Sequence, residues 1–203
     1  IVKKENIDCD FERLDGYLFG PHADLKEELG ALHSLNFKEV KYAGSPISSI
    51  KHKCLLFPKQ AQFHIMKYLD GLAKAIIKNK GLIFTETHAQ GIDSDGITTD
   101  KGFKIKAKNI FVATNAPINR NSLYMKQAPY RTYVISGLIP KGSFPKILLW
   151  DTEEPYHYLR AQNYNDSHDL LIVGGEDHRT GQKNDGKKRF LKLEKFARKI
   201  FPE

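Results

Sequence analysis

The sequence predicts an α+β chain in which an antiparallel or mixed sheet is interleaved with part of an α/β layer. Three observations support this fold class. Apolar residues recur at helical spacing over residues 60–79 and 185–201. Strand-like runs joined by Gly, Pro, Asn and Asp follow one another between residues 130 and 173. Between these parts, residues 97–113 have the pattern of a hairpin and then of an apolar strand buried on both faces of a sheet.

The first part of the chain is predicted to contain one strand and one helix. The aromatic stretch between Gly16 and Gly20 is typical of a short strand. Residues 21–35 are predicted to form a helix, because three leucines fall on one face and a proline marks the start. Residues 36–57 are expected to be irregular, with a short apolar run at their end.

The middle of the chain carries the clearest helical pattern, over Gln60–Asn79, with Gly81 as its stop signal. A strand is predicted to begin at Leu82–Phe84 and to run toward His88. A hairpin over residues 97–107 follows, and Asn109–Ala113 is predicted to be a fully buried strand.

The last part is predicted to be an antiparallel sheet followed by an amphipathic helix over residues 185–201. The four predicted strands are Tyr130–Ile139, Ile147–Trp150, Tyr156–Arg160 and Asp169–Val173.

Composition excludes several classes of protein. Hydrophobic residues make up 40% of the 203, which is enough for a real core and excludes a wholly disordered chain. No run reaches the roughly 18 apolar residues of a membrane span. Cys9 and Cys54 are far apart in sequence, so a disulfide scaffold or a four-thiolate metal site is excluded. They are predicted to be free thiols, which indicates a reducing compartment and a cytoplasmic location.

The net charge of +8 raises the possibility of a nucleic-acid-associated module. The basic residues are spread along the chain, however, and the densest run lies on the predicted helix over 185–201. A solvated helix face explains that run, and no nucleic-acid module signature accompanies it. We therefore predict no nucleic-acid partner, and this alternative stays open to a binding test.

Small polar residues follow the predicted apolar strand, at Ala113–Asn115. Such an exit places free backbone N–H groups at the carboxyl edge of a sheet, where α/β folds bind nucleotides. An ordinary strand-to-loop exit explains the same residues, and spacing alone slightly favours that reading.

Several stretches, in order along the chain, carry a resemblance to a known family. They are Ile7–Arg13 with Asp15–Phe19, Phe57–His64 with Lys67–Ala73, Ala113–Pro117, and Leu171–His178. Together they resemble flavin-dependent oxidoreductases of the D-amino acid oxidase superfamily, in the subgroup that often carries a C-terminal Rieske iron–sulfur domain. The fold implied is a D-amino acid oxidase-like substrate domain interleaved with part of an FAD/NAD(P)-binding layer.

The chain also departs from that family. It has no G-x-G-x-x-G loop for the FAD pyrophosphate and no Cys/His pattern for a Rieske cluster. It begins at Ile1 and stops at Glu203, so we expect the middle portion of a longer enzyme, which does not retain FAD by itself. The segments expected are a substrate-domain helical part (1–57), a partial FAD-binding part (58–117), and a substrate-domain sheet with a C-terminal helix (118–203).

The resemblance implies roles for individual residues. The positions that it places near the cofactor are His88, Ala89, Ala113, Thr114, Asn115, Gly174 and Gly175. The last two are expected to let a turn pass close to the flavin ring. The positions that it places on the substrate-facing sheet are Arg131, Tyr133, Tyr158 and Arg160.

Arginine clamps a carboxylate through two parallel hydrogen bonds, and a tyrosine hydroxyl adds a third. Arg131 and Tyr133 are two residues apart, as are Tyr158 and Arg160, so each pair shares one face of a strand. The alternative is that these tyrosines pack in the core and the arginines form surface ion pairs. No catalytic residue is assigned, and the histidines show no metal-ligand spacing, so no metal is predicted.

The function implied is that of a fragment of an FAD-dependent oxidoreductase that oxidises an amine or amino acid by hydride transfer to flavin. Its partners would be that small molecule and the remaining segments of the parent enzyme. This chain alone is expected to be inactive. The alternative, from another class, is a non-catalytic α+β domain that binds a ligand or a partner without flavin.

Overall fold

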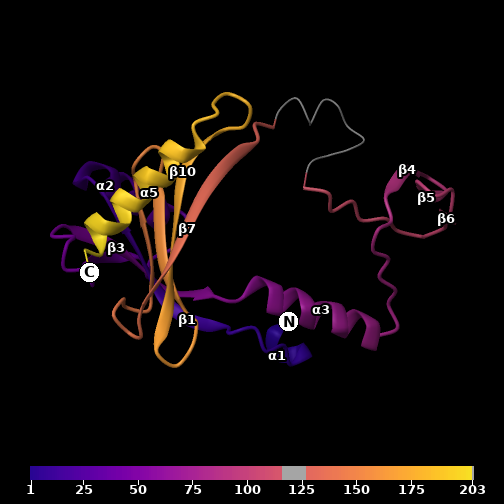
Figure 1. The fold of residues 1–203 in the computed structure, drawn as a ribbon, viewed down its shortest axis with the longest axis horizontal. Helices are drawn as coiled ribbons and strands as arrows, with labels where there is room; N and C mark the ends of the chain where they lie inside the picture. Colours follow the sequence, from indigo (N-terminus) through magenta and orange to yellow (C-terminus); the bar gives the residue numbers. More distant parts are fainter. Residues whose placement is uncertain (116–126, 203) are drawn as a thin grey trace. The chain divides into compact units, whose positions relative to one another are not determined.

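The computed structural model describes residues 1–115 and 127–202 of the chain (Figure 1). The chain divides into two compact units that interrupt each other along the sequence. Unit 1 contains residues 1–10 and 64–127, and unit 2 contains residues 11–63 and 128–203. The domain boundary expected at 117/118 lies outside the described residues.

Unit 2 is built on a seven-stranded sheet of order β2-β3-β1-β8-β9-β10-β7. All neighbouring strands are antiparallel except β1 and β8, which are parallel. The sheet is therefore mixed, and the predicted fold class is confirmed. The strands are β1 (Glu12–Phe19), β2 (Lys41–Gly44), β3 (Lys53–Gln62), β7 (Tyr130–Pro140), β8 (Ile147–Asp151), β9 (His157–Asn163) and β10 (His168–Arg179).

Two helices cover opposite faces of this sheet. Helix α5 (Gly186–Ile200) contributes Leu193 to the larger core, which also holds Cys54, and Figure 1 shows it running along the strands. Helix α2 (His22–Ser34) contributes Leu25 to a smaller core that holds Leu55. Since Cys54 and Leu55 are consecutive in β3, their side chains point to opposite faces.

On its own face of the sheet, helix α2 packs mainly against β3, toward the opposite edge of the sheet from β7. Val134 and Leu138 on β7 are 45% and 53% exposed there. We call this uncovered surface of β7–β10 the open face. Strand register places on it Val134, Leu138, Leu148, Tyr158, Arg160, Gln162 and Ile172.

In unit 1, helix α1 (Val2–Glu5) packs against α3 (Ile65–Lys78). Gly71 permits the close approach of the segment after α1, since a Cβ there would lie 2.4 Å from Ile7 Cγ2. A three-stranded antiparallel sheet contains β4 (Ala89–Asp93), β5 (Gly96–Thr99) and β6 (Lys104–Ile105). The hairpin predicted over 97–107 is therefore confirmed.

Several boundaries differ from the prediction, among them the end of β10, which continues to Arg179 beyond the predicted Val173. Residues 60–62 continue β3 instead of starting a helix, because Gln62 pairs with Glu12 of β1 and α3 is capped by the His64 side chain. The segment expected to be irregular contains β2 and the first half of β3, and the first strand begins at Glu12. Pro58 makes β3 hard to recognise in the sequence, because proline is rare inside strands. The register between β3 and β1 shifts close to Pro58, and a proline is tolerated at such an irregularity.

The strands predicted at 82–88 and 109–113 are wrong for this structure, since neither segment pairs with any described strand. A strand needs a neighbour to satisfy its backbone and to cover its side chains. Without one, Leu82 is 80% exposed and Phe111 is 93% exposed. The apolar face of helix α3 is likewise uncovered, since none of the residues of this helix is buried.

None of the described helices has the length and apolar character needed to cross a membrane. Cys9 and Cys54 are buried free thiols, as predicted.

Candidate functional site

Arg160 lies on the open face between two buried residues of β9, Leu159 and Ala161. Its Nη1 donates to Gln62 Oε1 and to Gln162 Oε1, each at 3.2 Å. Burial lowers the pKa of the guanidinium, although the neighbouring Tyr158 acts in the opposite direction. An arginine keeps its charge at neutral pH even so. Arg160 has no carboxylate partner in the described part of the chain, so its charge is available to an anion.

Tyr158 lies beside Arg160 on the open face, as the sequence predicts from their spacing. Its ring lies over the backbone of Gly174 on β10, where an added Cβ would be 2.2 Å from the Tyr158 hydroxyl oxygen. The ring also stacks on Tyr156, with centroids 6.1 Å apart. Gly174 therefore leaves the space over β10 that the end of the Tyr158 ring occupies.

Gly174 and Gly175 lie inside β10, not in the turn that was expected. Gly175 has φ +132°, and a Cβ there would be 2.1 Å from the carbonyl oxygen of Tyr156. A bulge follows before His178, and Glu176 within it has φ 55°. The two glycines thus serve the packing of β9 against β10.

The second predicted pair lies elsewhere. Tyr133 shares its register row with Gly175 and His157, which places it on the face covered by α5. Its hydroxyl is 3.0 Å from His178 Nε2, and the residue is buried. Arg131 is exposed two residues away on β7. The structure therefore brings Tyr158 and Arg160 together and does not add Arg131 or Tyr133 to them.

A charged cluster lies under α5, and the sequence pattern gave no signal for it. The ring of His157 lies between two buried carboxylates, with Nδ1 2.8 Å from Asp151 and Nε2 3.5 Å from Glu176. Burial opposes the charge on His157, but the hydrogen bonds and attraction of Asp151 and Glu176 outweigh it, so the pKa of His157 is raised. The ring also stacks on Phe196 of α5, with centroids 4.2 Å apart.

Two cations of α5 complete this cluster. Lys192 Nζ is 2.8 Å from Glu176, and Arg189 is paired with both Glu176 and Asp185. The strands and α5 are thus held together by charges whose partners come from four separate stretches of sequence. Only the final fold reveals that arrangement, which serves to anchor the helix.

The residues predicted to contact the cofactor fall in both units. In unit 1, the carbonyl of His88 accepts a hydrogen bond from the Asp100 N–H at 2.9 Å, and Ala89 opens β4. Residues 113–115 are exposed and form no strand, and Asn115 has φ 63°. Their exposed backbone is compatible with a nucleotide edge, but this chain lacks the glycine loop that grips a dinucleotide.

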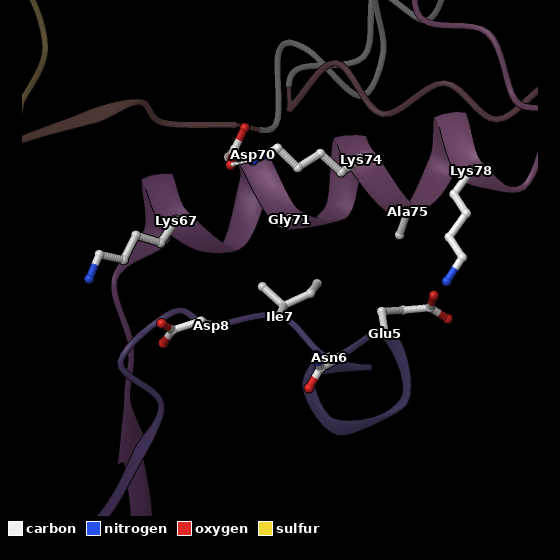
Figure 2. A pocket seen from close by; sticks show the side chains of 10 residues that line it. All are labelled: Glu5, Asn6, Ile7, Asp8, Lys67, Asp70, Gly71, Lys74, Ala75 and Lys78. Atoms are coloured by element: carbon white, nitrogen blue, oxygen red, sulfur yellow. Dashed lines mark hydrogen bonds and ion pairs between the residues drawn. The ribbon is translucent and has the colours of Figure 1, made fainter.

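A pocket of about 450 Å³ lies in unit 1 between the segment after α1 and helix α3. Figure 2 shows Ile7, Gly71 and Ala75 at its base, with acidic and basic side chains around it. Lys67 is paired with Asp10, and Lys74 with Asp70. Because acidic and basic side chains are equally represented in its lining, the pocket shows no clear preference for an anion or a cation. Among the described residues, no cluster of His, Cys, Asp and Glu side chains is placed to hold a metal ion.

A mixed sheet with one open face alternates along the sequence with a unit that contains two helices and a three-stranded antiparallel sheet. The family described as FAD dependent oxidoreductase matches residues 1–203, so the chain belongs to that family and the resemblance is confirmed. A relative in Bacillus subtilis (strain 168), the Rieske 2Fe-2S iron-sulfur protein YhfW, is 27% identical over 191 residues. That match covers 90% of this chain and 37% of the relative, so the chain spans just over a third of that protein's length.

Two solved structures share the fold. Glycine oxidase from Bacillus cereus ATCC 14579 has a TM-score of 0.64 and 13% identity, over 99% of this chain and 59% of that one. Iminodiacetate oxidase from Chelativorans sp. BNC1 has the same TM-score and identity, over 99% and 60%. At this level of identity the likeness concerns the fold alone.

Proposed function

We propose that the whole protein containing this chain oxidises an amine that carries a carboxylate, and that this chain supplies the substrate-binding sheet. The observation that carries the proposal is Arg160, a half-buried cation on the open face without a carboxylate partner in the described part of the chain. The names of the two solved relatives add support, since glycine and iminodiacetate are both amino acids with carboxylates.

Each side chain then has a definite task. Arg160 binds the substrate carboxylate through parallel hydrogen bonds, and the Tyr158 hydroxyl adds a further contact and fixes the orientation of the amine-bearing carbon. The apolar neighbours on the open face, Val134 and Ile172 among them, exclude water from that carbon. FAD, when bound, supplies the acceptor for the hydride.

The exposed apolar stretches of unit 1 support the expectation that other segments of the parent enzyme complete the FAD layer. Leu82, Ile83, Phe111 and Val112 are all exposed, although their sequence is that of buried strands. We propose that strands from the rest of the protein pair with these stretches. Residues 113–115 then lie at the carboxyl edge of a sheet, beside the cofactor, together with His88 and Ala89.

The test is Arg160→Ala in the whole protein, with glycine and iminodiacetate as substrates. Charge-assisted hydrogen bonds contribute about 1.5–3 kcal/mol, so the KM should rise about 10- to 100-fold. Flavin content should not change. Arg131→Ala is the matched control, because Arg131 lies on the other face of the sheet, and it should leave the KM unchanged.

Two outcomes would contradict the proposal. One is a whole protein that binds flavin but oxidises neither compound. The other is an Arg160→Ala variant with the kinetics of the unmodified enzyme.

A further inference from the structure

Two glutamine side chains hold Arg160, and they use only one of its three nitrogens. Both hydrogens of Nη1 are taken by the amide oxygens of Gln62 and Gln162, each at 3.2 Å. Nε and Nη2 have no protein partner in the part of the chain that the structure describes. Those two nitrogens form one edge of the guanidinium, with parallel N–H bonds that match a carboxylate. The glutamines therefore leave a complete binding edge free.

The orientation of the Gln62 amide is fixed by its own neighbours. Gln62 is buried, with 8% of its surface exposed. Its Nε2 donates to the carbonyl oxygen of Ala161 at 3.0 Å and faces Glu12 Oε2 at 3.4 Å. Glu12 is in turn held by Lys146 at 2.7 Å. Because both acceptors lie on the amino side of the amide, its oxygen must face Arg160.

An arginine that is largely shielded from water is usually paired with a carboxylate, whereas both acceptors of the half-buried Arg160 are neutral. A carboxylate at position 62 would form an ion pair with Arg160 and offset the charge that an anionic ligand needs. An amide oxygen fixes the same nitrogen and leaves the net charge in place.

We propose that Gln62 is a positioning residue, which orients Arg160 and preserves its positive charge for a carboxylate-bearing ligand. This inference rests on the proposed function and deepens it. It identifies the residue that keeps the open face selective for carboxylate-bearing ligands over amines that lack a carboxylate. Gln62 contacts no ligand itself and acts through Arg160 alone.

The experiment compares Gln62→Glu with Gln60→Glu in the whole protein. Gln60 lies two residues away on the same strand face, and the structure records no contact of its side chain with Arg160, so it receives the same charge change. The probe is glycolate, which has a carboxylate and no amine, and its Kd is measured by calorimetry. Gln62→Glu should weaken glycolate binding by about tenfold or more, and Gln60→Glu by less than about twofold.

A third variant separates charge from lost hydrogen bonding. Gln62→Met has similar volume, no charge and no acceptor for Arg160. If Gln62 only held Arg160 in place, Gln62→Met would be the worse variant, since a glutamate keeps the hydrogen bond. The inference requires instead that Gln62→Glu weaken glycolate binding more than Gln62→Met does. It also requires that the KM for glycine rise in Gln62→Glu by a larger factor than kcat falls.

A glutamate at position 62 lies close to Glu12, so the double variant Glu12→Gln with Gln62→Glu guards against misfolding, and flavin content reports folding. The inference would be overturned if Gln62→Glu and Gln60→Glu weakened glycolate binding equally. It would also be overturned if Gln62→Glu weakened that binding less than Gln62→Met does. In either case a weakened Arg160→Ala variant would leave the proposed function standing. If Arg160→Ala itself binds glycolate normally, the proposed function fails as well.

Discussion

At the scale of single residues, Gly174 shows how a missing side chain shapes the candidate site. The Tyr158 ring occupies the place of its Cβ, so a methyl group there would overlap the end of that ring at 2.2 Å. The ring end and an added methyl group cannot occupy the same place, so the ring must shift. A small change on β10 is therefore transmitted to Tyr158, which shares the open face with Arg160.

Gly174→Ala should consequently displace Tyr158 and weaken glycolate binding several-fold, with a loss of stability of about 1 kcal/mol from overpacking. Calorimetry and urea unfolding measure the two effects. Gly137→Ala is the control, since nothing lies within 4 Å of a Cβ at this position on the neighbouring strand. If both variants bind glycolate equally well, Gly174 has no role in placing Tyr158.

Residue patterns predicted part of this site from the sequence. The two-residue spacing correctly placed Tyr158 and Arg160 on one face of a strand. The same spacing in Arg131 and Tyr133 was indistinguishable, because only the packing of α5 decides which face is covered. Gln62 was not predictable either, since it is 98 residues from Arg160 and reaches it through strand register.

At the scale of elements, α5 combines an apolar stripe with the charged cluster around His157. The stripe was predicted from helical spacing, and the cluster was not, because its members come from β8, β9, β10 and α5. Asp151 and Glu176 face His157 from the strands, and Lys192 and Arg189 face Glu176 from the helix. His157 therefore joins neighbouring strands through Asp151 and Glu176, and it contacts the helix through Phe196.

The stability of unit 2 should depend on pH through His157. Its folded pKa is raised above the ordinary value of 6.5, so its contribution is fully present below that pH. The contribution is lost as the pH rises through the folded pKa. We expect the free energy of unfolding in urea to fall with rising pH above about 6.5, and this dependence should be reduced in His157→Gln.

His168→Gln is the matched control for that experiment. His168 lies on β10, and its ring bonds to Ser167 outside the cluster, so this variant should keep the pH dependence of the unmodified protein. An identical pH profile for His157→Gln and the unmodified protein would show that the cluster does not depend on a charged imidazole.

At the scale of the whole molecule, the interleaving of two units was implied by the family resemblance and not by local patterns. Most strands of the mixed sheet and its two helices were predictable from local patterns, because each strand carries its own alternation and each helix its own period. The apolar segments at 82–84 and 109–113 were not. Their composition is that of buried strands, but burial requires a neighbouring strand that the described part of the chain does not provide. Local pattern thus indicated a structure that depends on partners outside these segments.

Phe111 allows that dependence to be tested. It is 93% exposed, so Phe111→Asp should leave the thermal stability of this 203-residue chain unchanged within about 0.5 kcal/mol. In the whole protein the same change would bury a charge within the proposed FAD layer, which costs several kcal/mol. The amount of flavin bound per protein should then fall sharply, as measured by its visible absorbance.

Leu35→Asp is the control, since Leu35 is 69% exposed and lies at the end of α2 in the other unit. It should preserve flavin content in the whole protein. Full flavin content in Phe111→Asp would mean that residues 109–113 stay uncovered in the whole protein as well. The apolar stretch would then need an explanation other than the completion of a cofactor-binding layer, and the placement of residues 113–115 beside FAD would fail with it.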